Sequence, residues 1–236
     1  MGWSAINTTQ DSRNTEENMI IAIDGLAASG KGTLAKLLAR HFDFAHLDTG
    51  LLYRAVGVAV LRDGGDPAEP QAAAQAAQNF NPQQALALTE DLALRTHVAG
   101  DAASKVASIP AVRAALLDFQ RNFAHFPPQS KSGAVLDGRD IGTVIAPDAK
   151  VKIFVTANLP IRAARRGKEL RGRGENVTDA AVLADMQTRD VRDQNRGIAP
   201  AQPAADAVVL DTSELSVEEV FAAALAIVQK QAGVSA

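Results

Sequence analysis

The chain has 236 residues, a formal net charge of −3, 47% hydrophobic residues and no cysteine. This length is enough to bury a stable core, and the lack of cysteine excludes disulfides, thiolate zinc sites, iron–sulfur clusters and cysteine nucleophiles. No apolar run approaches the roughly 20 residues that span a bilayer, and residues 1–18 lack the apolar core of a signal peptide. We therefore expect a cytoplasmic protein with no membrane partner.

The charges are unevenly distributed along the chain. A net negative charge argues against broad nucleic-acid binding. However, 16 arginines outnumber 8 lysines, and 11 of the arginines lie between Arg113 and Arg196. The planar guanidinium group suits bidentate capture of phosphate or carboxylate. A local anion site is therefore expected within an acidic protein.

The pattern of apolar residues predicts one α/β domain over residues 19–236, preceded by a disordered polar extension at residues 1–18. Alternation of strands and helices favours a parallel sheet with helices on both faces and a ligand site at the carboxyl ends of the strands. Four of the predicted strands end in Asp. The strands are predicted at residues 19–24, 44–48, 133–137, 151–156 and 207–211, and the helices at 33–41, 51–62, 111–126, 160–170, 179–196 and 217–231.

Residues 63–103 interrupt this alternation with a segment rich in Ala, Gln and Pro. Residues 71–78 fit a helix, and residues 86–88 and 92–95 fit a pair of strands. We interpret residues 64–103 as an inserted subdomain on the substrate side.

A glycine-rich segment follows the first predicted strand and opens the next helix. It has the spacing of a phosphate-binding loop, although Gly32 stands where Ser or Thr is usual and Thr33 comes one place later. Residues 30–35 also match the dinucleotide pattern G-x-G-x-x-A, but that pattern places its first glycine directly at the strand end. Successive N–H groups and a lysine would bind nucleotide phosphates, and the expected contacts are Gly25, Leu26, Ala27, Ala28, Ser29, Gly30, Lys31, Gly32 and Thr33.

Three further motifs narrow the choice among phosphate-loop proteins. The chain lacks Asn-Lys-x-Asp and Asp-x-x-Gly, so it lacks the guanine and switch elements of a GTPase. It carries instead Asp48-Thr-Gly-Leu-Leu-Tyr-Arg54, Asp137-Gly-Arg-Asp-Ile-Gly142 and Arg189-Asp-Val-Arg-Asp-Gln-Asn-Arg196. With these motifs the chain resembles the bacterial cytidylate kinases, within the nucleoside monophosphate kinase superfamily, from Met19 to about Ala232.

This resemblance implies a P-loop core with a five-stranded parallel sheet, a small acceptor-binding insert and a mobile lid. The implied reaction transfers the γ-phosphate of ATP to CMP or dCMP, giving CDP or dCDP and ADP, in pyrimidine nucleotide metabolism. ATP would be used with Mg²⁺, which Thr33 is expected to help hold, while Asp137 is a weaker candidate for orienting a magnesium-bound water. The implied catalytic residues are Lys31, Arg139 and Arg189, and we expect a monomer.

The resemblance also implies how the acceptor is bound. Phosphate contacts are implied for Arg54, Arg139 and Arg196 with Thr49 nearby, sugar contacts for Asp193, and either contact for Arg189. Base contacts are implied for Ser104, Arg113 and Asp140. From spacing alone, the arginines at 189, 192 and 196 share one helical face and also fit a solvated salt-bridge surface. Likewise, Ser104 also fits a helix cap and Arg113 a surface charge.

A cluster of arginines and glycines at residues 159–176 has the composition of a lid that closes over the triphosphate, rather than of a merely flexible basic loop. Arg162 and Arg166 are its expected ATP contacts. Two classes of function stay open beside cytidylate kinase. One is another small-molecule kinase, for adenylate, uridylate or shikimate, and the other is a nucleotide sensor without turnover.

Overall fold

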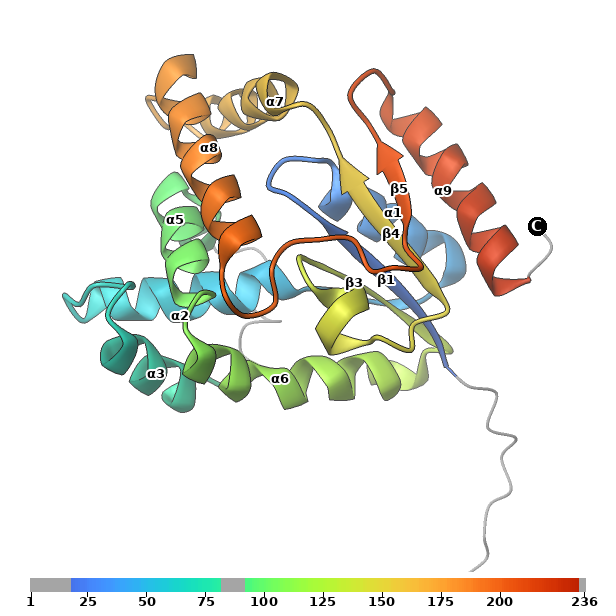
Figure 1. Ribbon diagram of the computed structural model, residues 1–236, viewed down its shortest axis with the longest axis horizontal. Helices are drawn as coiled ribbons and strands as arrows, with labels where there is room; N and C mark the ends of the chain where they lie inside the picture. Colours follow the sequence, from blue (N-terminus) through green and yellow to red (C-terminus); the bar gives the residue numbers. More distant parts are fainter. Residues whose placement is uncertain (1–17, 82–91, 234–236) are drawn as a thin grey trace, which may run out of the picture.

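The computed structural model describes residues 18–81 and 92–233. At its centre lies a sheet, of which β3, β1, β4 and β5 are labelled in Figure 1. Every paired strand is parallel, and the order is β2-β3-β1-β4-β5. This confirms the predicted five-stranded parallel sheet of an α/β fold. The strands are β1 (Met19–Gly25), β2 (Ala45–Asp48), β3 (Gly133–Gly138), β4 (Val151–Thr156) and β5 (Val208–Asp211).

Most helices begin and end close to their predicted positions. The last one starts with a capping box in which the Ser216 hydroxyl accepts from the Glu219 N–H and the Glu219 carboxylate accepts from the Ser216 N–H. The helices are α1 (Lys31–Phe42), α2 (Thr49–Arg62), α3 (Pro70–Asn79), α5 (His97–Val106), α6 (Pro110–His125), α7 (Leu159–Gly172), α8 (Asp179–Asn195) and α9 (Val217–Ala232).

The strands are apolar on both sides because helices cover both faces of the sheet. On one face, Ile21 and Ile23 of β1 pack with α1 and α9. On the other face, Ile20 and Ala22 pack with α6 and with a π-helical turn, η3 (Ile141–Ile145). Side chains along a strand alternate between the two faces of the sheet. The position of a residue in its strand therefore decides on which face its side chain lies.

Two helical layers lie beyond the carboxyl ends of the strands. Helices α2, α3, α5 and α6 share one core, whose largest members include Leu52 and Leu116. Helices α7 and α8 form a second pair, which packs through Leu170 and Met186 against the loop after β1. These layers stand around the tips of the strands in Figure 1, and they carry the predicted insert and lid.

The insert differs from its prediction. Leu92–Arg95 is a 3₁₀ helix, η1, so the strand predicted there is wrong. Leu94 is buried against α2. Its carbonyl accepts a hydrogen bond from the Arg54 side chain, where a strand would accept one from the backbone of a neighbouring strand. The other predicted strand, at residues 86–88, lies outside the described residues. The helix predicted at residues 71–78 is confirmed as α3, whereas α5 and the η3 turn were not predicted.

Within the described part of the chain, no helix combines the length and apolar character needed to cross a membrane.

Candidate active site

The glycine-rich loop joins β1 to α1, as its sequence predicts. Gly25 passes so close to β4 that a Cβ at this position would lie 2.1 Å from the Val155 carbonyl oxygen. Gly30 has φ of +94° and caps α1 without a side chain. Both positions therefore require glycine. The loop leaves the first N–H groups of α1 directed at the space where a phosphate would lie.

The backbone of this loop is braced from outside. Arg162 of α7 donates from Nη1 to the Ala27 carbonyl at 3.2 Å, and Thr212, after β5, donates to the Ser29 carbonyl at 2.9 Å. Arg165 in turn donates to the Thr212 hydroxyl at 3.0 Å. The loop is thus held in shape by α7 and the β5–α9 connection.

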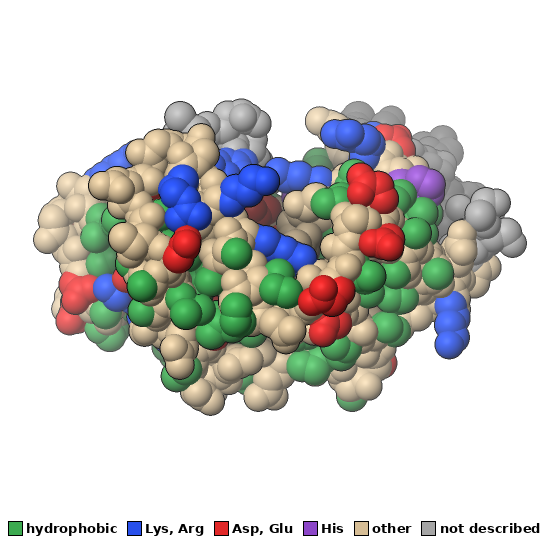
Figure 2. Space-filling view, turned by 90° about the horizontal axis from the view of Figure 1, so that it is seen from above, with side chains coloured by type: hydrophobic (Ala, Val, Ile, Leu, Met, Phe, Trp, Pro, Cys, Tyr) green, Lys and Arg blue, Asp and Glu red, His purple; other side chains and the backbone are tan. Residues whose placement is uncertain are grey.

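One cavity at the carboxyl ends of β2 and β3 brings together every residue that the resemblance assigns to the acceptor. Figure 2 shows this face of the molecule hollowed, with Lys and Arg side chains gathered around the hollow. The cavity reaches Lys31 and Gly32 of the phosphate-binding loop, and its predicted acceptor residues are Thr49, Arg54, Ser104, Arg113, Arg139, Asp140, Arg189, Asp193 and Arg196.

The end of the cavity nearest Lys31 is strongly cationic. Burial, together with the nearby charge of Arg139, lowers the pKa of Lys31 to about 7. Burial, with Arg189 and Arg166 close by, lowers the pKa of Arg54 to about 9. The Nε of Arg189 is buried and has no hydrogen-bond partner among the described residues. A bound anion such as a phosphate would relieve the repulsion among these cations. It would also accept a hydrogen bond from the buried Nε of Arg189.

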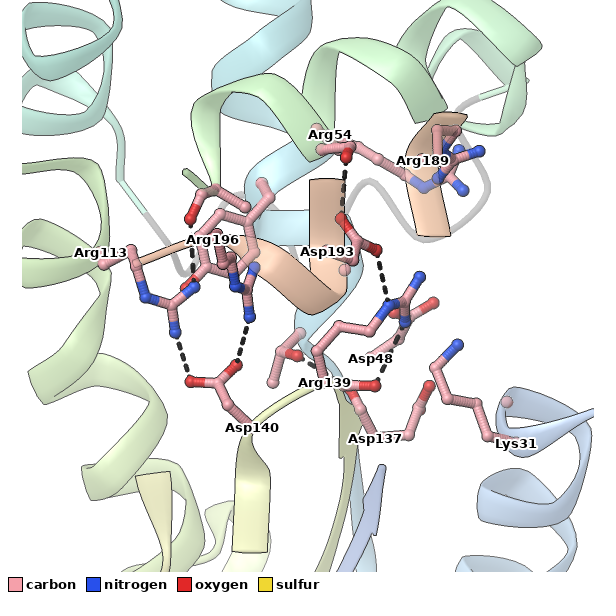
Figure 3. Close-up of a pocket in the computed structure, with 18 residues that line it drawn as sticks. Lys31, Asp48, Arg54, Arg113, Asp137, Arg139, Asp140, Arg189, Asp193 and Arg196 are labelled. Atoms are coloured by element: carbon pink, nitrogen blue, oxygen red, sulfur yellow. Dashed lines mark hydrogen bonds and ion pairs between the residues drawn. The ribbon is translucent and has the colours of Figure 1, made fainter. Parts of the chain in front are cut away.

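Asp193 of α8 connects the cationic end to α5. Its Oδ1 accepts from the Ser104 hydroxyl at 2.8 Å, and its Oδ2 accepts from Nε of Arg139 at 3.0 Å (Figure 3). Burial alone would raise the pKa of Asp193, but Arg139 and the Ser104 hydroxyl hold it below its ordinary value. Ser104 lies inside α5 rather than at a cap, so its hydroxyl is available for contacts in the cavity.

Asp140 organises the opposite end of the cavity. Its carboxylate forms an ion pair with Arg113 of α6 and a longer one, at 3.5 Å, with Arg196 (Figure 3). Arg113 also lies over the ring of Tyr53, 5.5 Å from its centroid. Arg113 is only 6% exposed, which excludes the alternative of a surface charge. In this structure Arg196 is bonded to Asp140, and its predicted contact with the acceptor phosphate stays a prediction.

Two carboxylates lie beside the phosphate-binding loop. Asp48 ends β2 and Asp137 lies opposite it in β3. Burial and the charge of Asp137 raise the pKa of Asp48. A Cβ at Gly32 would lie 3.6 Å from Oδ2 of Asp137, so the unusual glycine of the motif faces this acid. Thr33, the predicted magnesium ligand, is exposed and lines a second cavity.

Oxygen donors suit Mg²⁺, and two neighbouring buried carboxylates are relieved by a cation. In the described ranges, no group of three or more His, Cys, Asp or Glu side chains is placed to hold a metal. Mg²⁺ usually keeps several waters and is held by one or two carboxylates together with substrate phosphates. The residues present therefore fit magnesium delivered with a nucleotide.

The predicted lid arginines lie in α7 and are engaged with the protein. Arg162 is 4% exposed and donates to Asp190 at 2.6 Å as well as to the loop carbonyl. Arg166 donates to Glu169 at 2.8 Å and, more weakly, to the Thr96 carbonyl of the insert. Neither lines the acceptor cavity. Their contact with ATP stays a prediction.

The second cavity lies beside the phosphate-binding loop, between α1 and the start of α9. Its walls combine aliphatic side chains with Arg165 and the Thr212 hydroxyl, and they are formed by Gly30, Thr33, Leu34, Leu37, Arg165, Thr212, Leu215, Ser216, Val217 and Val220. A flat apolar group joined to phosphates on the loop would fit such walls.

Sequence reasoning missed Asp48, Tyr53, Gly100 and Thr212. Asp48 ends a predicted strand and lines the acceptor cavity. Tyr53 follows Thr49 by one helical turn and therefore lines the same cavity. Gly100 has no recognisable sequence signal, because its role depends on Arg189 of another helix. Thr212 follows a predicted strand, and its contact with the loop joins segments 183 residues apart.

Comparisons with known proteins agree with the site. A family model described as cytidylate kinase matches residues 21–230. A cytidylate kinase from Rhodospirillum rubrum is 58% identical over 209 residues, covering 89% of this chain and 96% of that protein. Cytidylate kinases from Paramagnetospirillum magneticum and Methylocella silvestris are each 59% identical, covering 89% of this chain and 97% and 94% of those proteins.

Proposed function

We propose residue roles for the reaction of the cytidylate kinase family, to which this chain belongs: transfer of the γ-phosphate of ATP to CMP or dCMP, giving ADP and CDP or dCDP. The observation that carries these roles is the single cavity that joins the phosphate-binding loop to the acceptor residues. It supports an arrangement in which the phosphates of both nucleotides meet beside Lys31.

Arg54, Arg139 and Arg189 bind the acceptor phosphate in this proposal. They come from α2, the β3 tip and α8, and Arg54 donates to the Leu94 and Thr96 carbonyls. Burial, and then the charges of Arg189 and Arg166, lower the pKa of Arg54, and an acceptor phosphate beside these arginines offsets both effects. Arg196 also binds the acceptor phosphate in this proposal, after its ion pair with Asp140 is broken.

Phosphoryl transfer needs little covalent help from the protein. The acceptor oxygen is already an anion, so no general base is required. Lys31 and Arg139 bring two mutually repelling polyanions together and stabilise the charge that develops on the transferred group, and Arg189 adds to this stabilisation. Arg162 and Arg166 of the lid segment, residues 159–176, contact the donor phosphates when the segment closes.

Magnesium bound with ATP would neutralise phosphate charge during transfer. Asp137 and Asp48 would hold it through water, with the Thr33 hydroxyl as a further oxygen donor. The adenine of ATP occupies the second cavity, where Leu37 and Val220 supply apolar contacts.

The base of the acceptor is read at the Asp140 end of the cavity. The Asp140 carboxylate accepts from the 4-amino group of cytosine, and Arg113 donates to its carbonyl. The Ser104 hydroxyl gives its proton to Asp193, so its oxygen accepts from the amino edge of the base beside Asp140. Asp193 binds the sugar. The ion pairs of Asp140 with Arg113 and Arg196 support an ionised Asp140 carboxylate, which can accept a hydrogen bond from the base.

A coupled assay with ATP and a panel of monophosphates tests this function. We expect turnover with CMP and dCMP, and at least tenfold lower kcat/KM with UMP, because uracil presents a carbonyl to Asp140. Comparable efficiency with AMP or UMP, turnover of shikimate, or no reaction with any nucleotide would contradict it. A cytoplasmic monomer acting in pyrimidine nucleotide metabolism completes the proposal, and size-exclusion chromatography and cell fractionation test its first two parts.

A further inference from the structure

His46 of β2 is bonded to an acid of the site, although no role has been given to it. Its Nε2 lies 2.8 Å from Oδ1 of Asp137, across 91 residues of sequence. Strand register explains the contact. His46 pairs with Val135 and Asp48 pairs with Asp137, so His46, Asp48 and Asp137 lie on one face of the sheet. Val135 packs with α1 on that face, and the phosphate-binding loop enters α1 there.

The direction of this hydrogen bond is set by its acceptor. An ionised carboxylate can only accept, so Nε2 of His46 carries the proton and donates it to Oδ1. The other oxygen, Oδ2, is the one that faces Gly32 and the loop. Asp137 is 2% exposed, so water does not readily replace His46 as the donor.

The surroundings of Asp137 make its orientation sensitive to this donor. Asp48 repels the carboxylate from the neighbouring strand, and Lys31 attracts it from the start of α1. Asp48 and Lys31 are half-buried beside the buried Asp137, and all three are labelled in Figure 3. A fixed donor on Oδ1 holds the carboxylate plane and leaves Oδ2 free for the phosphate-binding loop.

We propose that His46 is a positioning residue for the magnesium site: it holds Oδ1 of Asp137 so that Oδ2 orients the metal-bound water of the bound nucleotide. This inference rests on the proposed role of Asp137. A ligand's hydrogen-bond partner typically changes metal affinity or activity by tenfold or more when removed. His46 lines neither the acceptor cavity nor the second cavity, so the proposal expects its removal to act on magnesium through Asp137.

Two variants and a matched control test the inference. His46→Leu removes the donor and keeps much of the volume, whereas His46→Gln places an amide N–H near the position of Nε2. His125→Leu serves as the control because His125 is a partly exposed histidine of α6, 3.8 Å from Asp148 and away from the cavity. Calorimetry measures ADP binding with Mg²⁺ and with EDTA, and a coupled assay measures kcat at increasing free Mg²⁺.

Magnesium is expected to increase the affinity for ADP, measured as the ratio of the Kd in EDTA to the Kd in Mg²⁺. For His46→Leu we expect this ratio to fall about tenfold. ADP binding in EDTA and the KM for CMP should stay within twofold of the unmodified protein. His46→Gln should recover most of the magnesium effect, and His125→Leu should leave it unchanged. The Mg²⁺ concentration that half-saturates kcat should rise in His46→Leu and return toward normal in His46→Gln.

Three results would overturn the proposal. These are an unchanged magnesium effect in His46→Leu, an equal loss of ADP affinity with and without magnesium, and equal losses in the Leu and Gln variants with lowered melting temperatures. The calorimetric comparison does not depend on CMP turnover. A protein that fails to phosphorylate CMP would therefore contradict the proposed function without deciding the role of His46.

Discussion

Arg189 of α8 occupies space that Gly100 of α5 leaves open. A Cβ at Gly100 would lie 3.0 Å from Nη1 of Arg189, closer than a side chain comfortably approaches. This contact links the insert to α8, which carries Arg189 and Asp193 and is followed by Arg196 at its C-cap. It also shows why a glycine without positive φ stands inside α5.

Gly100→Ala is expected to shift the Arg189 guanidinium by a few tenths of an ångström. Because the crowded atom is the end of a flexible side chain, stability should change little, while the KM for CMP should rise about tenfold through misplacement of a phosphate contact. Steady-state kinetics with varied CMP and ATP measures this change. Gly172→Ala is the control, since no atom lies within 4 Å of the added methyl group. Equal KM values for CMP in the two variants would contradict the prediction.

Lys31→Ala should lower kcat by about 10² to 10³, because it removes a charge that stabilises the transferred phosphoryl group. The fold should be retained, since in the part of the chain that the structure describes the lysine side chain makes one hydrogen bond, at 3.3 Å to the Leu26 carbonyl. Turnover at saturating substrates measures the loss. Lys36→Ala, at an exposed position of the same helix, provides the comparison. A rate near that of the unmodified protein would remove the loop lysine from the mechanism.

Arg54→Ala and Arg196→Ala should each raise the KM for CMP by about 10-fold to 100-fold and affect the KM for ATP far less. Each variant loses a charge-assisted bond to the acceptor phosphate. Initial rates with each substrate varied in turn separate the two effects. Arg192→Ala is the matched control on α8, because Arg192 pairs with Asp101 at 2.9 Å and does not line the cavity. A larger effect on ATP would mean that the arginines had been assigned to the wrong substrate.

Asp140→Asn should narrow the difference in kcat/KM between CMP and UMP. Its amide can donate to the uracil carbonyl, whereas an unmatched buried acceptor costs about 1 to 3 kcal/mol, or about 10-fold to 200-fold in kcat/KM. The ratio of the two kcat/KM values is the measurement, because it cancels any general loss from the broken ion pair with Arg113. An unchanged ratio would place Asp140 in folding or catalysis instead of base recognition.

Asp24 should make stability depend on pH. Its carboxylate accepts from the Ile141 and Gly142 N–H groups at 2.8 Å each. Burial nevertheless raises its pKa from 3.8 to about 7. Between these values the folded protein holds a proton that the unfolded chain has released. The protonated Asp24 therefore contributes its full share to the free energy of unfolding below about pH 4, and this share is lost as the pH rises through 7.

The contribution amounts to at most about 4 kcal/mol. Asp24→Asn cannot titrate, so its denaturation free energy should decline less than that of the unmodified protein between pH 5 and 8. Urea denaturation across this range tests the difference in slope. Parallel curves for the two proteins would show that Asp24 keeps an ordinary pKa. A lower stability of the variant at every pH would not decide the pKa of Asp24, because Asn cannot accept hydrogen bonds from both N–H groups.

The sequence was sufficient to predict the parallel sheet and the loop between β1 and α1. Runs of β-branched residues alternating with amphipathic segments admit few other folds, and Gly25 and Gly30 stand where local backbone geometry requires glycine. The motifs, and the family resemblance that they carry, also indicated nine of the residues that line the acceptor cavity, with Ser104 and Arg113 indicated by the resemblance alone. Local patterns failed at Leu92–Arg95, because Arg54, far away in sequence, decides where the Leu94 carbonyl is bonded.

Only the tertiary structure decided how the identified residues are connected. Sequence gives no sign that Asp140 is shared by Arg113 and Arg196, that Gly100 makes room for Arg189, or that His46 donates to Asp137. Each of these relationships joins segments between 27 and 91 residues apart. Periodicity and turn chemistry report on neighbours along the chain, whereas the orientation of a buried charge is set by whichever strands and helices packing brings beside it.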